Sequence, residues 1–180
     1  MFMAQIHIRN TGERIRGEAE VKAFLDKQGV LYEHWDINQI PDRLQNKFTL
    51  SDTEKEEVLA SLDNDIKRLA STRGYIKWDV ITLSEATPDL DALLKKFEQV
   101  HTHTEDEVRA ITAGSGVFII KGAPEVGYFD VELEAGDVIS VPENNPHFFT
   151  LTSEKKVVAI RLFIDPSGWV AHPFACPAFA

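Results

Sequence analysis

Apolar residues recur at helical spacing in the first part of the chain. The clearest case is residues 51–74, where Val58 and Leu62 belong to one apolar stripe. Ser51 and Glu54 stand at the start of this segment with the spacing of a capping box. We therefore expect one continuous helix over residues 51–74. Shorter helices are expected at residues 18–29 and 88–97, and strands at residues 30–37 and 75–83.

From about residue 97 the pattern changes to short runs of β-branched and aromatic residues separated by glycine and proline. Examples are VFIIKG, YFDVEL, DVISVP and KVVAIRLFID. Many short strands at close spacing favour an antiparallel barrel or a double-sheet jelly roll over βαβ units. We expect a mainly β protein with peripheral helices, built as one domain. Its expected parts are a mixed helix and strand portion (1–74), a barrel core (75–165) and a C-terminal tail (166–180).

Composition makes this a globular chain and narrows its partners. Hydrophobic residues are 43% of the 180 positions, which is enough to form a core. The formal net charge of −10 disfavours binding to nucleic acids and to anionic lipid surfaces. Cys176 is the only cysteine, so an internal disulfide and a thiolate metal cluster are excluded. With no signal-peptide pattern and no long apolar run, we expect a cytoplasmic protein that does not enter the membrane.

Four residues of the strand-rich part have the side chains of a metal site. His101 and His103 are two residues apart, Glu107 follows closely, and His147 lies in a later strand-like run. Because strand side chains alternate between faces, His101 and His103 share one face. Imidazole and carboxylate ligands without thiolate suit Fe, Ni, Cu, Mn or Zn. We therefore expect one metal at these four residues, whereas His7, His34 and His172 are expected to be ordinary solvated or hydrogen-bonded histidines.

The same alternation predicts which apolar residues line the interior beside the histidines. Phe149 is two residues after His147, and Phe97 is separated from His101 by an even number of positions. Both phenyl rings are therefore expected on the inner face of the barrel.

Two arginines are candidates for the same face. Arg109 is two residues after Glu107, and Arg161 occurs in the run AIRLFI with a weaker claim to the interior. A buried guanidinium needs an anionic partner, because an unpaired buried charge is very costly. For Arg109 this partner is either a bound anionic substrate or an internal carboxylate, and the sequence leaves both open.

Two segments resemble the motifs of the cupin superfamily. The stretch HTHTEDE, with Gly114 seven residues after Glu107, is similar to the first cupin motif. The stretch GDVISVPENNPH, which begins at Gly136 and ends at His147, is similar to the second. Lys95 and Asn144 stand where these motifs usually have glycine, and both differences concern turns rather than ligands.

Within the cupins the whole chain resembles the acireductone dioxygenases of methionine salvage. The helical portion before the barrel, the His-x-His-x3-Glu-x-Arg run and the ending AIRLFIDPSGWVAHPF carry this resemblance. It implies one Fe(II) or Ni(II) per chain and places Arg109 beside the substrate. The implied ligands are His101, His103, Glu107 and His147, and the implied apolar wall is Phe97, Phe149 and Trp169.

The resemblance also implies a reaction. The substrates would be O2 and the acireductone 1,2-dihydroxy-3-keto-5-methylthiopentene. The iron form would release 4-methylthio-2-oxobutanoate and formate, and the nickel form 3-methylthiopropanoate, formate and carbon monoxide. Which metal is loaded, the role of Cys176 and the choice between a monomer and a small homo-oligomer are left open by the sequence.

Two other functions remain compatible with the residues. One is a different cupin dioxygenase or isomerase that acts on another enolic substrate. The other is a cupin that holds a metal without catalysis. A flavonol would need a wide flat cavity, whereas Phe97, Phe149 and Arg109 suggest a small anionic head with a slim tail.

Overall fold

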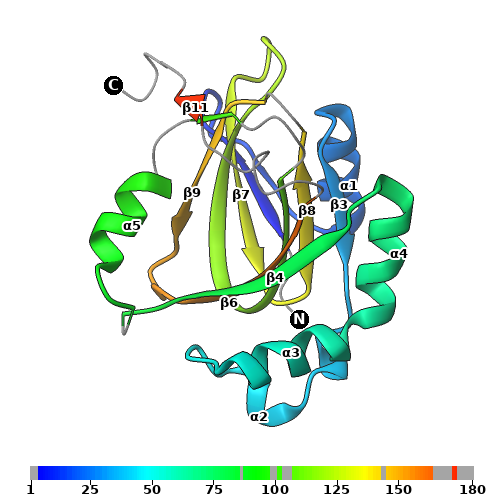
Figure 1. The fold of residues 1–180 in the computed structure, drawn as a ribbon. Coiled ribbons are helices and arrows are strands. Elements are labelled where there is room, and N and C mark those ends of the chain that lie inside the picture. Colours follow the sequence, from blue (N-terminus) through cyan, green and yellow to red (C-terminus); the bar gives the residue numbers. More distant parts are fainter. Residues whose placement is uncertain are drawn as a thin grey trace.

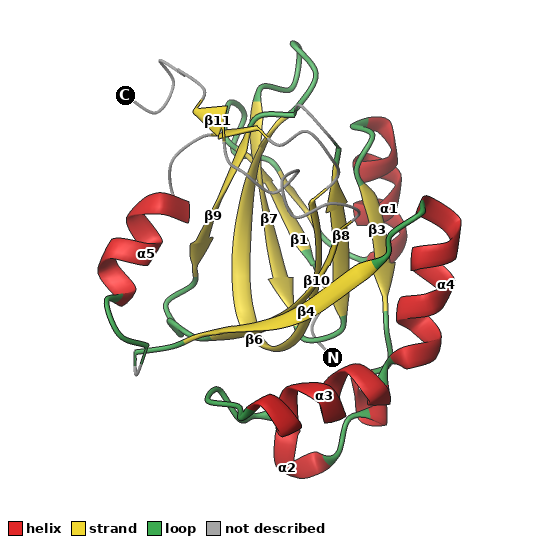
Figure 2. Ribbon diagram, viewed as in Figure 1, coloured by secondary structure: helices red, strands yellow, loops and turns green. Residues whose placement is uncertain are grey.

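A computed structural model describes residues 4–85, 87–97, 101–102, 107–142, 145–163 and 172–173. One antiparallel sheet curls into a barrel-like shell, and the helices lie outside it (Figures 1 and 2). The strands are β1 (Gln5–Ile8), β2 (Arg14–Ile15), β3 (Leu31–His34), β4 (Lys77–Leu83), β5 (His101–Thr102), β6 (Glu107–Lys121), β7 (Tyr128–Glu134), β8 (Asp137–Val141), β9 (His147–Leu151), β10 (Val157–Phe163) and β11 (His172–Pro173). The helices are α1 (Glu18–Lys27), η1 (Ile37–Gln39), α2 (Asp42–Gln45), α3 (Asp52–Ser61), α4 (Asp63–Arg73) and α5 (Leu90–Phe97). The prediction of an antiparallel barrel with peripheral helices is confirmed.

The long strand β6 organises the sheet. Its first half pairs with β8 and β10, and its second half pairs with β7 and β9. The N-terminal portion also contributes strands, because β1 pairs with β7 and β3 pairs with β8. The barrel is therefore built from strands on both sides of residue 75, which the pattern of short runs after residue 97 did not predict.

Two apolar cores lie on the two faces of the curled sheet. The inner core fills the barrel and includes Phe118, Phe129 and Ile139, all fully buried. The outer core joins the sheet to α3 and α4 and includes Leu62, Ile66 and Ile160. A sheet covered on both faces needs apolar residues at successive positions, and the five residues of β8 are indeed all buried.

A bulge in β6 changes which residues face inward. Ala159 of β10 pairs with Ile111, but the preceding Val158 pairs with Ala113, so Thr112 is the extra residue. Odd-numbered residues face the inner core before the bulge, as Ile111 does, and even-numbered residues such as Phe118 face it afterwards. The bulge therefore lets one strand supply the inner face of both halves of the barrel.

The backbone conformation explains why two positions of the cupin-like motifs are glycine. Gly114 and Gly136 have positive φ angles of 72° and 100°. A Cβ at Gly114 would lie 2.2 Å from the carbonyl oxygen of Lys156, and one at Gly136 would lie 2.6 Å from the ring of His34. Both positions therefore need a residue without a side chain.

The expected single helix over residues 51–74 is wrong in one respect. The structure has two helices, α3 and α4, with a break at Leu62. The flanking Ser61 hydrogen-bonds the carbonyl of Glu57, and Asp63 opens the next helix, where acidic residues favour the N-terminus. The predicted ends are confirmed, with a full capping box at Ser51 and a left-handed C-terminal residue at Gly74. Among the described residues, no helix combines the length and the apolar character needed to cross a membrane.

The capping box predicts a measurable loss of stability. Ser51 Oγ accepts a hydrogen bond from the backbone N–H of Glu54 at 3.2 Å, and the Glu54 side chain accepts one from the backbone N–H of Ser51 at 3.0 Å. Ser51→Ala should lower the free energy of unfolding by about 1 kcal/mol. Urea unfolding monitored by circular dichroism measures this change. The matched control Ser71→Ala removes only a bond to a carbonyl of its own helix and should change stability little; an equal loss in both variants would contradict the capping argument.

Candidate metal centre

His147 is positioned as a metal ligand would be. It opens β9, it is 1% exposed, and its Nδ1 lies 2.8 Å from the carbonyl oxygen of Asn145. A carbonyl oxygen can only accept a hydrogen bond, so Nδ1 of His147 carries a proton and donates it to the carbonyl of Asn145. The preceding Pro146 is held by a hydrogen bond from the backbone N–H of Lys121 to its carbonyl. Such support of the second ring nitrogen is the usual arrangement at metal-binding histidines.

The sheet brings His101 next to His147. The two residues are direct partners in the antiparallel pairing of β5 with β9. On its other side His147 pairs with Ile120 of β6. Two residues that are far apart in the sequence therefore stand on adjacent strands at the same level of the barrel, as the metal-site prediction requires.

Glu107 and Arg109 begin β6. Glu107 pairs with Val141 of β8, and Arg109, two residues later, pairs with Ile139 of the same strand. Arg109 is 5% exposed, and Ile111, two residues on, belongs to the inner core. The prediction that Arg109 lies in the interior is confirmed. The choice between a bound anion and an internal carboxylate as its partner stays open.

An apolar wall continues inward from His147. Phe149 follows on the same face of β9, as the alternation predicted, and is 6% exposed. Its ring centroid lies 5.0 Å from that of Phe118, which in turn lies 6.1 Å from the ring of His147. A Cβ at Gly116 would lie 2.5 Å from the Phe149 ring, so this ring occupies the space that any side chain at Gly116 would need. Phe118 and Gly116 were not predicted from the sequence, because the bulge reverses the alternation of β6 before both of them.

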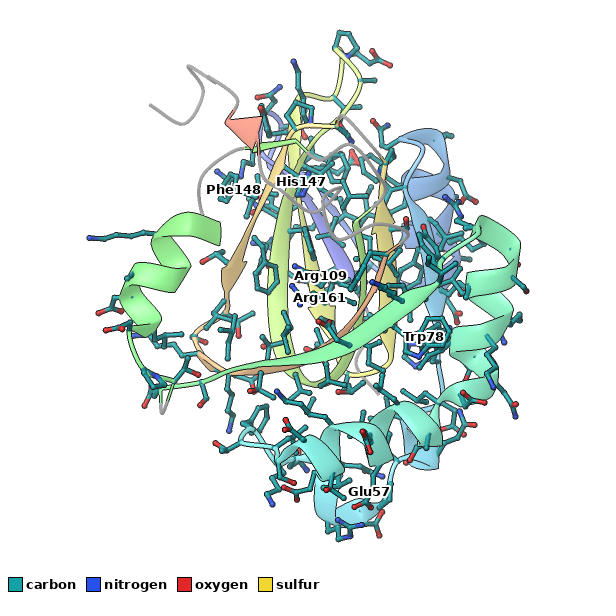
Figure 3. The ribbon with its side chains drawn as sticks, in the orientation of Figure 1. Glu57, Trp78, Arg109, His147, Phe148 and Arg161 are labelled. Atoms are coloured by element: carbon teal, nitrogen blue, oxygen red, sulfur yellow. The ribbon has the colours of Figure 1, made fainter. Side chains whose placement is uncertain are left out.

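Arg161 lies beside Arg109 and is paired with a carboxylate. It is the direct partner of Arg109 across β10 and β6 (Figure 3). Its Nε lies 2.7 Å from Oδ1 of Asp79, a residue of the neighbouring strand β4. Arg161, the weaker of the two arginine candidates for the interior, therefore lies next to Arg109 on the sheet. Its charge is compensated by Asp79. The sequence contained a signal that Asp79 faces the interior. In the predicted strand it lies on the same face as the apolar Ile81 and Leu83.

One expected relation is wrong. Phe97 was expected to share a strand face with His101, but it is the last residue of helix α5, whose end at Phe97 agrees with the helix expected over residues 88–97. The amphipathic run before Phe97 extends the helix to that residue, so the alternation of a strand does not apply to it.

Other expected residues fall outside what the structure describes. His103 and Trp169 are outside the described residues, as is Cys176, and for Phe97, His101, Glu107 and His172 the description covers the backbone alone. No cluster of three metal-capable residues occurs among the described side chains, which include only one of the four expected ligands.

The remaining described histidines have ordinary partners. Nδ1 of His34 lies 3.3 Å from Oδ1 of Asp137, within hydrogen-bond distance, and the partly exposed His7 has its Nδ1 3.6 Å from a carboxylate oxygen of Asp130. Burial raises the pKa of the Asp137 carboxyl, which accepts a hydrogen bond from Tyr32 at 2.6 Å, and burial also raises the pKa of Tyr32. This network ties β3 to β8 and belongs to the framework of the barrel rather than to the metal centre.

The curled antiparallel sheet, with His147 and Arg109 buried inside it, defines a cupin-type barrel suited to a metal centre. A model of the ARD/ARD' family matches residues 5–171, and the chain belongs to this family.

Close relatives extend over almost the whole chain. An acireductone dioxygenase of Geobacillus kaustophilus is 67% identical over 172 residues, which are 96% of this chain and 96% of that protein. An acireductone dioxygenase of Bacillus cytotoxicus is 52% identical over 93% of this chain and 98% of its own length. A solved structure, the acireductone dioxygenase from Bacillus anthracis with a cadmium ion in its active centre, superimposes with a TM-score of 0.91. It is 48% identical and covers 94% of this chain and 97% of its own.

The contact between Gly116 and Phe149 leads to a prediction. Gly116→Ala should displace the Phe149 ring and lower the free energy of unfolding by about 1–3 kcal/mol, the usual cost of overpacking. Thermal unfolding measures the loss, and cross-peaks between the Phe149 and Phe118 rings in NMR spectra report the displacement. The double variant Gly116→Ala/Phe149→Leu should recover part of the stability, since the smaller side chain leaves room for the methyl group. No recovery would show that the strain lies elsewhere.

Proposed function

We propose that this chain is a metal-dependent dioxygenase that cleaves acireductone, 1,2-dihydroxy-3-keto-5-methylthiopentene, with O2 in methionine salvage. The observation that carries the proposal is the buried His147, whose Nδ1 donates to the carbonyl of Asn145 and whose strand partner is His101. Membership of the ARD/ARD' family and relatives named acireductone dioxygenase support the choice of substrate.

The ligand set of the proposal is His101, His103, Glu107 and His147, holding one Fe(II) or Ni(II) per chain. Two of these residues are strand partners, and a third opens β6. The hydrogen bond from Nδ1 of His147 fits this role, because it leaves Nε2 as the ring nitrogen that a metal would bind. Imidazole and carboxylate donors accept both ions, so cellular availability decides which one is loaded.

The side chains of the barrel then have distinct tasks. A divalent ion, when bound, supplies Lewis-acid polarisation of the enediol oxygens. The buried Arg109 supplies a fixed positive charge toward the negative charge that develops on the substrate. Phe118 and Phe149 exclude water and offer an apolar surface to the methylthio tail. Phe97 and Trp169 complete this wall in the proposal.

The proposal includes partners and surroundings. Acireductone and O2 are small molecules, and the net charge of −10 gives no attraction to nucleic acids or anionic membranes. With a single cysteine, the chain suits a reducing cytoplasm, where we place it as a monomer or a small homo-oligomer.

The decisive experiment compares the two metal forms. Apo-protein loaded separately with Fe(II) or Ni(II) should consume oxygen when acireductone is supplied. Iron should yield 4-methylthio-2-oxobutanoate and formate, and nickel should yield 3-methylthiopropanoate, formate and headspace carbon monoxide. Tight metal binding without oxygen uptake would favour a non-catalytic cupin. Uptake only with another enolic compound would favour a different dioxygenase.

Replacing a ligand should remove the metal. His147→Ala should lower the bound metal per chain at least about tenfold, because the loss of one donor weakens a four-ligand site strongly. Elemental analysis after dialysis measures the metal content. His7→Ala is the matched control, since His7 also lies on a strand but pairs with Asp130 at the surface. Equal metal content in both variants would remove His147 from the ligand set.

Replacing Arg109 should separate metal binding from catalysis. Arg109→Ala should keep the metal and lower kcat about 100- to 1,000-fold, as the loss of one charge-stabilising donor does in other enzymes. Arg109→Lys should recover only part of the rate, since the planar fork is lost. Steady-state oxygen uptake and elemental analysis measure both quantities. If Arg109→Ala unfolds instead, the guanidinium serves an internal salt bridge.

A further inference from the structure

Three charged side chains from three adjacent strands lie on one rung of the sheet. Arg161 of β10 stands directly opposite Asp79 of β4 and directly opposite Arg109 of β6. Two residues away along these strands, Ile81, Ala159 and Ile111 all contact the inner core, so the rung belongs to the inner face. It leads from the partly exposed side chain of Asp79 to the buried Arg109.

Asp79 holds the guanidinium of Arg161 by two contacts. Nε lies 2.7 Å from Oδ1, and Nη2 lies 2.5 Å from Oδ2. This parallel pair of charge-assisted hydrogen bonds fixes the orientation of the guanidinium as well as its position. Asp79 and Arg109 lie on opposite sides of Arg161. The ion pair with Asp79 therefore holds the guanidinium of Arg161 toward β4 and away from Arg109.

The compensation by Asp79 matters because two like charges stand opposite each other on this rung. Directly opposed like charges destabilise a sheet pair, and their repulsion grows where water is excluded. Arg109 is 5% exposed, whereas the side chains of Arg161 and Asp79 are 30% and 41% exposed. The carboxylate of Asp79 therefore offsets the charge of one of the two opposed guanidinium groups.

We propose that Asp79 is a positioning residue that sets the strength with which the interior binds an anion. By offsetting the charge of Arg161 and orienting its guanidinium, Asp79 lowers the positive potential that the ionised acireductone meets beside Arg109. This inference rests on the proposed function, in which Arg109 lies beside the substrate.

Neutralising the charges of Asp79 and Arg161 one at a time supplies the test. Asp79→Asn raises the net charge of the three side chains from one positive unit to two, and Arg161→Gln lowers it to zero. The double variant Asp79→Asn/Arg161→Gln restores the original net charge. Asp79→Glu keeps the carboxylate and is the conservative variant. Asp130→Asn is the matched control, because Asp130 forms a comparable ion pair with Arg9 away from the rung.

The expected result is a pair of opposite shifts in KM for acireductone. Asp79→Asn should lower KM about twofold to fivefold without raising kcat, because the added cation attracts the substrate and its transition state alike. Arg161→Gln should raise KM by a similar factor, and the double variant should return toward the wild-type value. Asp79→Glu and Asp130→Asn should stay close to wild type. A rise in KM in both single variants would show that the ion pair serves only to hold β4 against β10, and would overturn the inference.

A binding measurement separates this inference from the proposed function. Calorimetric titration with the anion 4-methylthio-2-oxobutanoate should give tighter binding for Asp79→Asn, weaker binding for Arg161→Gln and wild-type binding for the double variant. If the wild-type protein consumes no oxygen with acireductone but this order holds, the proposed function fails alone. If oxygen is consumed but all variants share the same KM and Kd, the role of Asp79 fails alone.

Discussion

Backbone pairing along β6 is the constraint on which the candidate site depends. This strand hydrogen-bonds to β8 and β10 in its first half and to β7 and β9 in its second half. Arg109 lies on it, while His147 and Arg161 lie on strands paired with it, so their relative positions follow from one ladder of backbone hydrogen bonds. Such a framework holds catalytic groups more firmly than loops do, because side chains that leave a paired strand have few directions open to them.

The interior of the barrel is divided by polarity. Rings and aliphatic side chains fill the inner core around Phe118 and Phe129, whereas the charged rung of Asp79, Arg161 and Arg109 crosses the inner face two residues from Ile111. An isolated charge in such surroundings would be costly, and the carboxylate of Asp79 reduces that cost for one of the two arginines. The same ion pair reduces the repulsion between the two arginines that stand opposite each other.

Glycine determines the position of the aromatic wall. The Phe149 ring fills the space above Gly116 and packs against Phe118, next to His147. Close packing transmits displacements, so a methyl group at Gly116 would be felt at the candidate metal centre. A glycine therefore determines where the aromatic rings beside His147 can lie.

The sequence by itself determined the features that depend on neighbouring residues. The capping box at Ser51, the shared face of His147 and Phe149, and the motif glycines Gly114 and Gly136 follow from local spacing, which backbone geometry obeys wherever the segment is placed. The arrangement of His101, His103, Glu107 and His147 also indicated a metal site, although the structure describes the side chain of only the last.

Only the tertiary structure decided the features that depend on distant partners. The bulge at Thr112 arises from the register with β10, and the break at Leu62 separates two helices that pack on one curved sheet. The ion pair of Asp79 with Arg161 joins residues 82 positions apart. No local pattern contains such contacts, because their free energy appears only when the strands that carry them have been paired.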